Sequence, residues 1–222
     1  YEIMPSLVGS EMCIRDSAND EDSETLTPAA RGLVLRADIT QPSNHRAISH
    51  LNDWLVKNYM PGVCGIDTRH LTRVIRDGGA PNGMLVHNPE GSFDIPAMQE
   101  ACAAWPGLEG MDLAAQVTCK QTYAWTETRW QLGIGHGQLE YPRYHIVAMD
   151  FGIKRNILRC LASAGCRITV VPATTQASEI LSMDPDGIFL SNGPGDPAAT
   201  GVYAVPTAVS YTHLTLPTIL LV

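Results

Sequence analysis

Residues 145–190, HIVAMDFGIKRNILRCLASAGCRITVVPATTQASEILSMDPDGIFL, decide the fold class of this chain. Short apolar runs at 145–149, 167–171 and 187–190 are typical of buried strands. Helical spacing of apolar residues fills 154–164 and 178–183, between those runs. A strand–helix–strand–helix–strand order predicts an α/β fold, with a parallel sheet and right-handed crossovers.

Two loops follow strands of this predicted sheet. Asp150-Phe-Gly152 comes after the first strand, and Asn192-Gly-Pro-Gly-Asp-Pro197 comes after the third. Ligands of open parallel sheets bind beyond the carboxyl ends of the strands. Two glycines around a proline expose backbone N–H groups that suit an anion or a developing oxyanion. A plain rigid turn is the equally open alternative for Asn192–Pro197.

The first half of the chain has a less regular pattern. A strand is expected within 31–38, followed by a helix that Ser43 caps and that carries Ala47 to Leu55. Asp67 is expected to cap a second helix, and 84–87 to form a strand. Residues 125–144 predict an edge hairpin and a linker, since Gly133–Gly137 lacks the flanking strand and helix of a nucleotide-binding loop.

Composition excludes several classes of protein. The 222 residues carry 23 acidic and 15 basic side chains, a net charge of −8, which argues against nucleic-acid binding. There is no long apolar run for a membrane span and no Walker-type phosphate loop. Six cysteines without a C-x-x-C pair predict no metal site. Reduced thiols and the lack of a signal-peptide pattern indicate a cytoplasmic protein.

Four blocks of sequence, in a fixed order, carry a resemblance to a known family. The chain resembles the small, glutamine amidotransferase subunit of carbamoyl phosphate synthetases. Two of the blocks belong to a domain that other class I glutamine amidotransferases lack. The blocks are Gly65–Arg73 (GIDTRHLTR), Pro106–Leu113 (PGLEGMDL), Asp150–Leu158 (DFGIKRNIL) and Asp186–Pro197 (DGIFLSNGPGDP).

The resemblance implies a domain plan. Residues 18–130 match part of the small-subunit N-terminal α/β domain, and 131–144 are expected to link it to the next domain. Residues 145–209 match the start of a class I glutamine amidotransferase domain, with a flavodoxin-like parallel sheet. The flanks, 1–17 and 210–222, are expected to be a non-native leader and a non-native tail, because neither has the pattern of a native terminus.

The resemblance also implies an activity. Such subunits hydrolyse L-glutamine with a cysteine nucleophile, a histidine and an orienting glutamate. The ammonia passes to a large subunit, which uses ATP, magnesium and bicarbonate to make carbamoyl phosphate for arginine and pyrimidine biosynthesis. The family places no cofactor in the small chain itself.

This chain departs from the family pattern at the nucleophile. The family's elbow, G-x-C-x-G, follows the N-G-P-G-D loop by one β-α unit, and none of the six cysteines here has that setting. The catalytic Cys, His and Glu are therefore expected to be absent. Gly193 and Gly195 are the residues that match glutamine-binding positions, and Gly193 is expected to lend its N–H to the oxyanion hole.

Two expectations follow from this departure. The chain reads as an inactive fragment, or alternatively as a non-catalytic docking module for the large subunit. Arg69, Arg73 and Arg76, on one predicted helix, form either a docking face or a solvated face.

A sheet that stops at its third strand leaves an exposed edge. The first half is therefore expected to be better ordered than the second.

Overall fold

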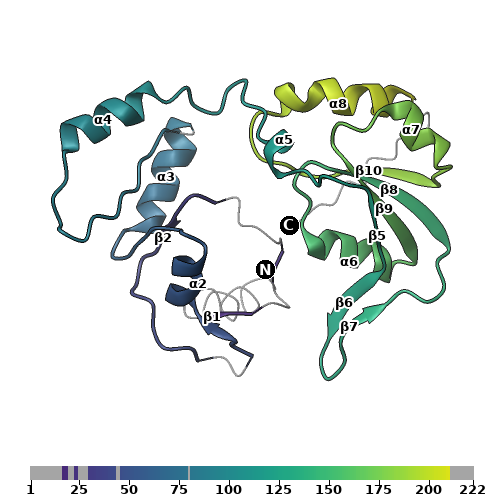
Figure 1. The fold of residues 1–222 in the computed structure, drawn as a ribbon, viewed down its shortest axis with the longest axis horizontal. Coiled ribbons are helices and arrows are strands. Elements are labelled where there is room, and N and C mark those ends of the chain that lie inside the picture. Colours follow the sequence, from purple (N-terminus) through teal and green to yellow (C-terminus); the bar gives the residue numbers. More distant parts are fainter. Residues whose placement is uncertain (1–16, 20–22, 25–29, 44–45, 80, 211–222) are drawn as a thin grey trace. The chain divides into compact units, whose positions relative to one another are not determined.

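The computed structural model describes residues 17–19, 23–24, 30–43, 46–79 and 81–210. The predicted leader lies outside the described residues except for Ser17, and the predicted tail lies outside them except for Ser210. The chain forms two compact units, Tyr1–Gly107 and Leu108–Val222. Each unit is described by itself below, with the elements labelled in Figure 1.

The second unit is built on a four-stranded sheet of order β10-β8-β9-β5. Its strands are β5 (Tyr123–Trp125), β8 (Tyr144–Asp150), β9 (Cys166–Pro172) and β10 (Gly187–Leu190). The predicted parallel arrangement is confirmed, since β8 pairs in parallel with both β9 and β10. The sequence did not predict β5, which pairs antiparallel with β9.

Helices cover both faces of this sheet, as Figure 1 shows. Along β8, Val147 and Met149 face one layer, and Ala148 between them faces the other. The first layer holds α7 (Ala177–Ser182) and also contacts α5 (Ala114–Val117) and α8 (Pro197–Ser210). The second layer is α6 (Arg155–Ser163). Burial on both faces explains why the strands read as continuous apolar runs.

A β-hairpin projects from the second unit. Its strands, β6 (Glu127–Gln131) and β7 (Gly135–Gln138), pair antiparallel, and β6 packs against α6. The predicted hairpin is therefore present. Residues 131–144, expected as a linker, include β7 and lie within the second unit, because the boundary between the two units falls between Gly107 and Leu108 in the chain.

The first unit is made of short elements. Its described residues form three helices, α2 (Leu51–Lys57), α3 (Thr68–Gly78) and α4 (Ile95–Ala104), and four two-residue strands. These strands are β1 (Ser17–Ala18), β2 (Leu33–Val34), β3 (Ser49–His50) and β4 (Gly62–Val63). They form two small pairs, β1 with β3 and β2 with β4.

Two expectations for this unit are wrong and two are confirmed, since the strand expected within 31–38 is present as β2. Helix α2 starts at Leu51, not near Ser43, because the His50 side chain accepts the N–H of Asn52 and caps the helix there. Residues 84–87 form no strand. Asp67 does cap α3, accepting the N–H groups of Arg69 and His70.

The buried apolar residues lie mostly in the second unit. Among the described residues of the first unit, only Leu51 and Leu55 are buried hydrophobics. Helices α3 and α4 bury no residue at all. This packing gives no support to the expectation that the first half is the better ordered one, because short paired segments without a core cannot hold a fold strongly. No helix in the described part of the chain is long and apolar enough to cross a membrane.

Candidate functional site

The two loops singled out from the sequence leave the sheet at the same edge. Met149 of β8 stands opposite Leu190 of β10 in a parallel pair, so the residues after both strands emerge together. Ser191 joins them, because its N–H donates to the Met149 carbonyl (3.2 Å) and its Oγ accepts the N–H of Phe151 (2.9 Å). We call Asn192–Pro197 the glycine loop.

Asp150 fixes the loop that follows β8. The side chain is 6% exposed, and Oδ1 accepts the N–H groups of Gly152 and Ile153, each at 2.8 Å. Its other oxygen, Oδ2, accepts the N–H of Cys119 at 2.7 Å. A buried carboxylate is tolerated when such donors satisfy it. Asp150 therefore holds the Phe151–Gly152 turn in one conformation.

The glycine loop rests on that turn through glycines. A Cβ on Gly193 would collide with the Phe151 carbonyl oxygen and lie 2.9 Å from the Phe151 Cβ. Gly152 has a φ of +114°, and a Cβ there would lie 3.3 Å from Pro194 Cδ. Both glycines are required by close approach, so the backbone of Gly193 lies directly on the Phe151–Gly152 turn.

The other side of the glycine loop meets residues 108–113. Gly195 has a φ of +87°, and a Cβ there would lie 2.6 Å from the Met111 carbonyl oxygen. Asp196 Oδ2 accepts the N–H of Gly110 at 2.9 Å, and the Asp196 N–H donates to the Met111 carbonyl at 3.2 Å. The N–H groups of Gly110 and Ala198 hold the pKa of the Asp196 carboxyl below its usual value.

Cys119 is the cysteine that lies against this arrangement, and it is poorly suited to attack. Burial, together with the neighbouring Asp150 carboxylate, raises the pKa of its thiol to about 11. The thiolate is the nucleophilic form, so at neutral pH this side chain is an inert thiol. The same surroundings, burial first, raise the pKa of Tyr123 to about 12.

Comparisons with known proteins find two family matches in this chain, one in each half. Residues 6–85 match the family described as carbamoyl-phosphate synthase small chain, CPSase domain, and residues 147–218 match glutamine amidotransferase class-I. The chain is 53% identical over 205 residues to the carbamoyl phosphate synthase small chain of Agrobacterium fabrum, covering 90% of this chain and 51% of that protein. It is 55% identical over 195 residues to the protein of the same name from Rhizobium meliloti, covering 85% of this chain and 49% of that protein.

The chain belongs to the carbamoyl phosphate synthase small chain family. The order of the two matches is the predicted one, a small-chain domain followed by a class I glutamine amidotransferase domain. The chain spans about half the length of the curated relatives that it matches.

Within this family frame, the structure brings together the residues that the sequence singled out. Gly193 and Gly195 lie in one loop at the sheet edge, next to the Asp150 turn. Sequence reasoning missed Ser191 and Asp196, whose side chains bond backbone groups far away in the chain. Local patterns predict bonds of Ser and Asp to neighbouring backbone only, so sequence spacing held no signal for these distant partners.

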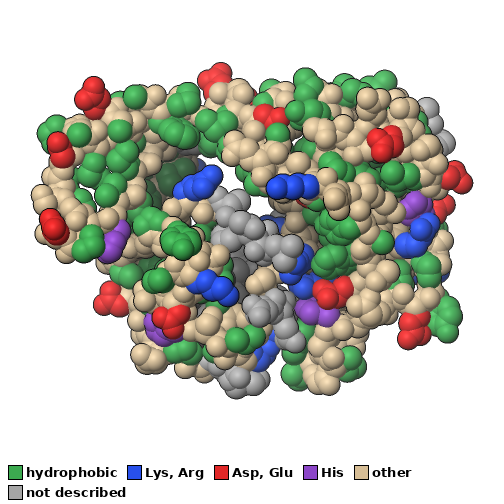
Figure 2. Space-filling model, in the orientation of Figure 1, with side chains coloured by type: hydrophobic (Ala, Val, Ile, Leu, Met, Phe, Trp, Pro, Cys, Tyr) green, Lys and Arg blue, Asp and Glu red, His purple; other side chains and the backbone are tan. Residues whose placement is uncertain are grey.

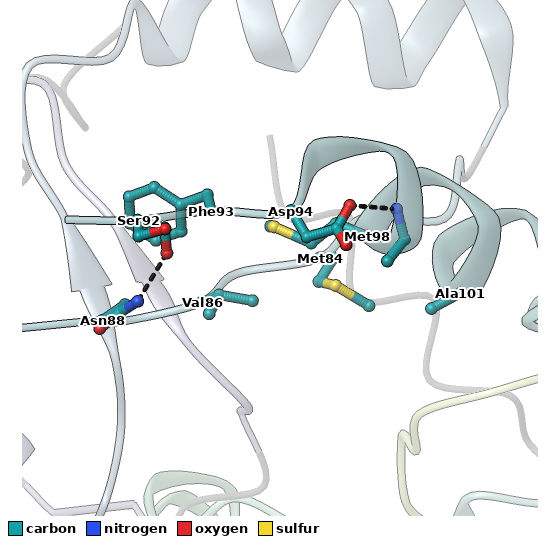
Figure 3. Close-up of a pocket in the computed structure, with 9 residues that line it drawn as sticks. Met84, Val86, Asn88, Ser92, Phe93, Asp94, Met98 and Ala101 are labelled. Atoms are coloured by element: carbon teal, nitrogen blue, oxygen red, sulfur yellow. Dashed lines mark hydrogen bonds between the residues drawn. The ribbon is translucent and has the colours of Figure 1, made fainter. Parts of the chain in front are cut away.

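A separate hollow lies in the first unit, as shown in Figure 3. It has a volume of about 330 Å³ and is lined chiefly by apolar side chains, including Met84, Val86 and Met98. Its polar side chains serve local turns, since Asp94 accepts the N–H of Ala97 and Asn88 donates to the Ser92 carbonyl. We find no catalytic grouping in it. Among the described residues no cluster of three metal-ligating side chains occurs either.

Proposed function

We propose that this sequence forms part of the glutaminase subunit of carbamoyl phosphate synthase. In this proposal the subunit hydrolyses L-glutamine and supplies ammonia to a large synthetase subunit. ATP, magnesium and bicarbonate are used by that large subunit, and the small chain holds no cofactor. The pathway is arginine and pyrimidine biosynthesis, and the location is the cytoplasm.

One observation carries the proposal, the position of Gly193 in the glycine loop. Its backbone lies at the carboxyl edge of a parallel sheet, where ligands of such sheets bind. The Phe151–Gly152 turn excludes any side chain at 193, so this position is reserved for glycine. A backbone N–H there stabilises the oxyanion that forms when a nucleophile attacks an amide carbon, and one such donor contributes roughly 3 kcal/mol.

The proposal assigns no catalytic step to the 222 residues by themselves. None of their six cysteines has the G-x-C-x-G setting of the family's nucleophile, and the Cys119 thiol has a pKa of about 11. We therefore expect the purified chain to release no glutamate from glutamine above the uncatalysed rate. An assay that couples glutamate release to glutamate oxidation measures this. Release of glutamate at an enzymatic rate would contradict this part of the proposal.

A chimera tests the family function directly. Residues 18–209 of this chain replace the matching part of the Agrobacterium fabrum small chain, which is then assayed for glutamine hydrolysis together with its large subunit. We expect the chimera to hydrolyse glutamine. Gly193→Ala keeps the N–H but must displace it, because its Cβ collides with the Phe151 carbonyl oxygen, so this variant of the chimera is expected to lower the rate by about 100-fold or more. Gly201→Ala is the matched control, because a Cβ there meets only Val205 Cγ2 at 3.9 Å. A folded but inactive chimera would refute the proposal.

A second candidate function is a docking module for the large subunit. Helix α3 favours it, since Leu71, Val74 and Ile75 are 37–46% exposed and no residue of the helix is buried. Figure 2 shows that apolar side chains lie at the surface of this face of the molecule, among scattered charges. Capture of the chain by an immobilised large subunit, and loss of that capture in Val74→Asp, would support docking. Equal capture of both chains would refute a docking role for α3.

A further inference from the structure

The sequence block at 106–113 has no role in the proposed chemistry, although it is one of the four blocks that identify the family. In the structure, its part within the second unit touches the glycine loop at two residues. A Cβ on Gly195 would meet the Met111 carbonyl and the Leu113 backbone, and Asp196 bonds both Gly110 and Met111.

Asp196 makes these bonds with different atoms. Its Oδ1 accepts the N–H of Ala198 at 2.8 Å, which is the bond of an ordinary N-terminal cap on α8. Its Oδ2 is directed elsewhere and accepts the N–H of Gly110, 86 positions earlier in the sequence. Capping alone needs one oxygen, so the second oxygen serves the 108–113 segment.

A second carboxylate, on the 108–113 segment, bonds a residue that follows the glycine loop. Asp112, within the segment, accepts the hydroxyl of Tyr203 on α8 at 3.1 Å and the N–H of Ala115 at 3.0 Å. The segment is thus tied to the loop by Asp196 and to the following helix by Asp112. These two hydrogen-bonded connections restrict the glycine loop and the 108–113 segment together, whereas a single bond to an exposed loop would restrict neither.

We propose that residues 108–113 are a positioning element for the glycine loop, and that Asp196 is the positioning residue through which they act. Asp196 holds Gly195 in its left-handed conformation against the Met111 carbonyl. That conformation sets the direction of the Gly193 N–H, two residues earlier, toward the site. The inference rests on the proposed function for its meaning, since the N–H that is positioned is the proposed oxyanion donor.

The test is backbone NMR relaxation on the ¹⁵N-labelled 222-residue chain. Asp196→Ser keeps a capping oxygen for α8 but has no second oxygen for Gly110, and Asp196→Asn presents an amide NH₂ to one of the two N–H groups. We expect the order parameters of the Gly193 and Gly195 amides to fall from about 0.85 to below about 0.6 in both variants. The amides of Val147 in β8 and Thr200 in α8 are expected to stay unchanged.

A matched control comes from the opposite end of the same sheet. Asp186 Oδ2 also accepts a distant backbone N–H, that of His145 at 2.7 Å. Asp186→Asn is expected to shift the His145 amide and to leave Gly193 and Gly195 as they are. Unchanged Gly193 and Gly195 amides in Asp196→Ser, or equal changes in Asp186→Asn, would overturn the proposal.

Gly195→Ala decides the question if the Asp196 variants also disturb the sheet. Its Cβ must displace the Met111 carbonyl, so the amides of Gly110 and Leu113 are expected to shift; unshifted amides would overturn the proposal. These readouts need no glutamine hydrolysis. An inactive chimera would therefore refute the proposed function and leave the positioning geometry, whereas a rigid loop in Asp196→Ser would refute only the positioning role.

Discussion

Gly193 and Gly201 lie eight positions apart and differ in what surrounds them. A side chain at 193 meets the Phe151 backbone, whereas a Cβ at 201, on a helix, makes only an ordinary contact with Val205 Cγ2 at 3.9 Å. We expect Gly193→Ala to lower the free energy of unfolding by about 1–3 kcal/mol, the usual cost of forcing atoms into a packed site. Gly201→Ala is expected to raise it by about 0.5–1 kcal/mol, the gain from alanine in a helix.

Urea unfolding followed by circular dichroism measures both changes. Because the two substitutions are chemically identical and lie in the same unit, any difference between them reports the local environment. Equal effects of the two alanines would show that the glycine loop does not rest on the Phe151 turn.

The Asp196 carboxylate makes a pH-dependent contribution to stability. Its pKa in the folded chain lies below the ordinary 3.8, because the N–H groups of Gly110 and Ala198 favour the charged form. A depressed folded pKa gives stability that is present above the unfolded pKa and is lost as pH falls through the folded pKa. Wild type is therefore expected to exceed Asp196→Asn in unfolding midpoint at neutral pH, with the gap closing in acid.

Urea midpoints of the two chains, measured from pH 7 down to about pH 2, check this expectation. Asp186→Asn, measured in parallel, separates the Asp196 effect from general acid destabilisation. A gap between wild type and Asp196→Asn that stayed constant across this range would contradict the assigned hydrogen bonds.

The residues of the candidate site could be predicted only in part. Gly193 and Gly195 stand out because two glycines around a proline after an apolar strand form a local pattern. Asp196 does not stand out, because its Oδ2 bonds Gly110, 86 positions away; Met111 does not stand out, because it contributes only its backbone carbonyl. Long-range bonds to backbone leave no mark in sequence spacing.

At the scale of elements, the β6–β7 hairpin is held to α6 by an ion pair between a buried arginine and a partly exposed glutamate. Arg159 Nε donates to Glu127 Oε1 at 2.7 Å, and the Arg159 side chain is only 6% exposed. Removing the Glu127 carboxylate leaves the buried Arg159 guanidinium without its charged partner. We expect Glu127→Ala to lower the free energy of unfolding by about 3 kcal/mol, and Glu127→Leu combined with Arg159→Leu to recover most of the loss.

The exposed pair of Arg76 and Asp77 is the control for this prediction. The two side chains are 72% and 69% exposed. Asp77→Ala is therefore expected to lower the free energy of unfolding by less than about 1 kcal/mol. Urea unfolding measures all of these variants. A Glu127→Ala effect no larger than that of Asp77→Ala would show that the hairpin does not depend on the pair.

The elements themselves were predicted best where burial and periodicity agreed. Strands β8, β9 and β10 have apolar runs because both faces of the sheet are covered. Helix α8 was missed because Pro206 and Gly201 interrupt its pattern, although Pro197 at its start suits a first helical turn. Residues 84–87 have the pattern of a strand in isolation, but none of the described strands pairs with them.

For the whole molecule, the distribution of buried residues predicts the distribution of stability. The second unit packs two apolar layers against β8 and β9, each seven residues long, whereas the described strands of the first unit have two residues each. Opening free energies range from near zero in weakly packed segments to the global value in a core. We therefore expect the amides of β8 and β9 to exchange most slowly with solvent, and those of α3 and α4 to exchange far faster.

Hydrogen exchange of the whole chain, read by mass spectrometry on overlapping peptides, measures this order directly. The buried Leu51 and Leu55 make α2 the internal reference, so its protection is expected to fall between that of α3 and that of β8. The open edge of the sheet at β10 gives a second gradient within the described strands. Since β10 pairs only with β8 while β8 pairs on both sides, β10 is expected to exchange faster than β8. Equal protection of α3 and β8 would mean that the first unit is stabilised by contacts other than its own buried side chains.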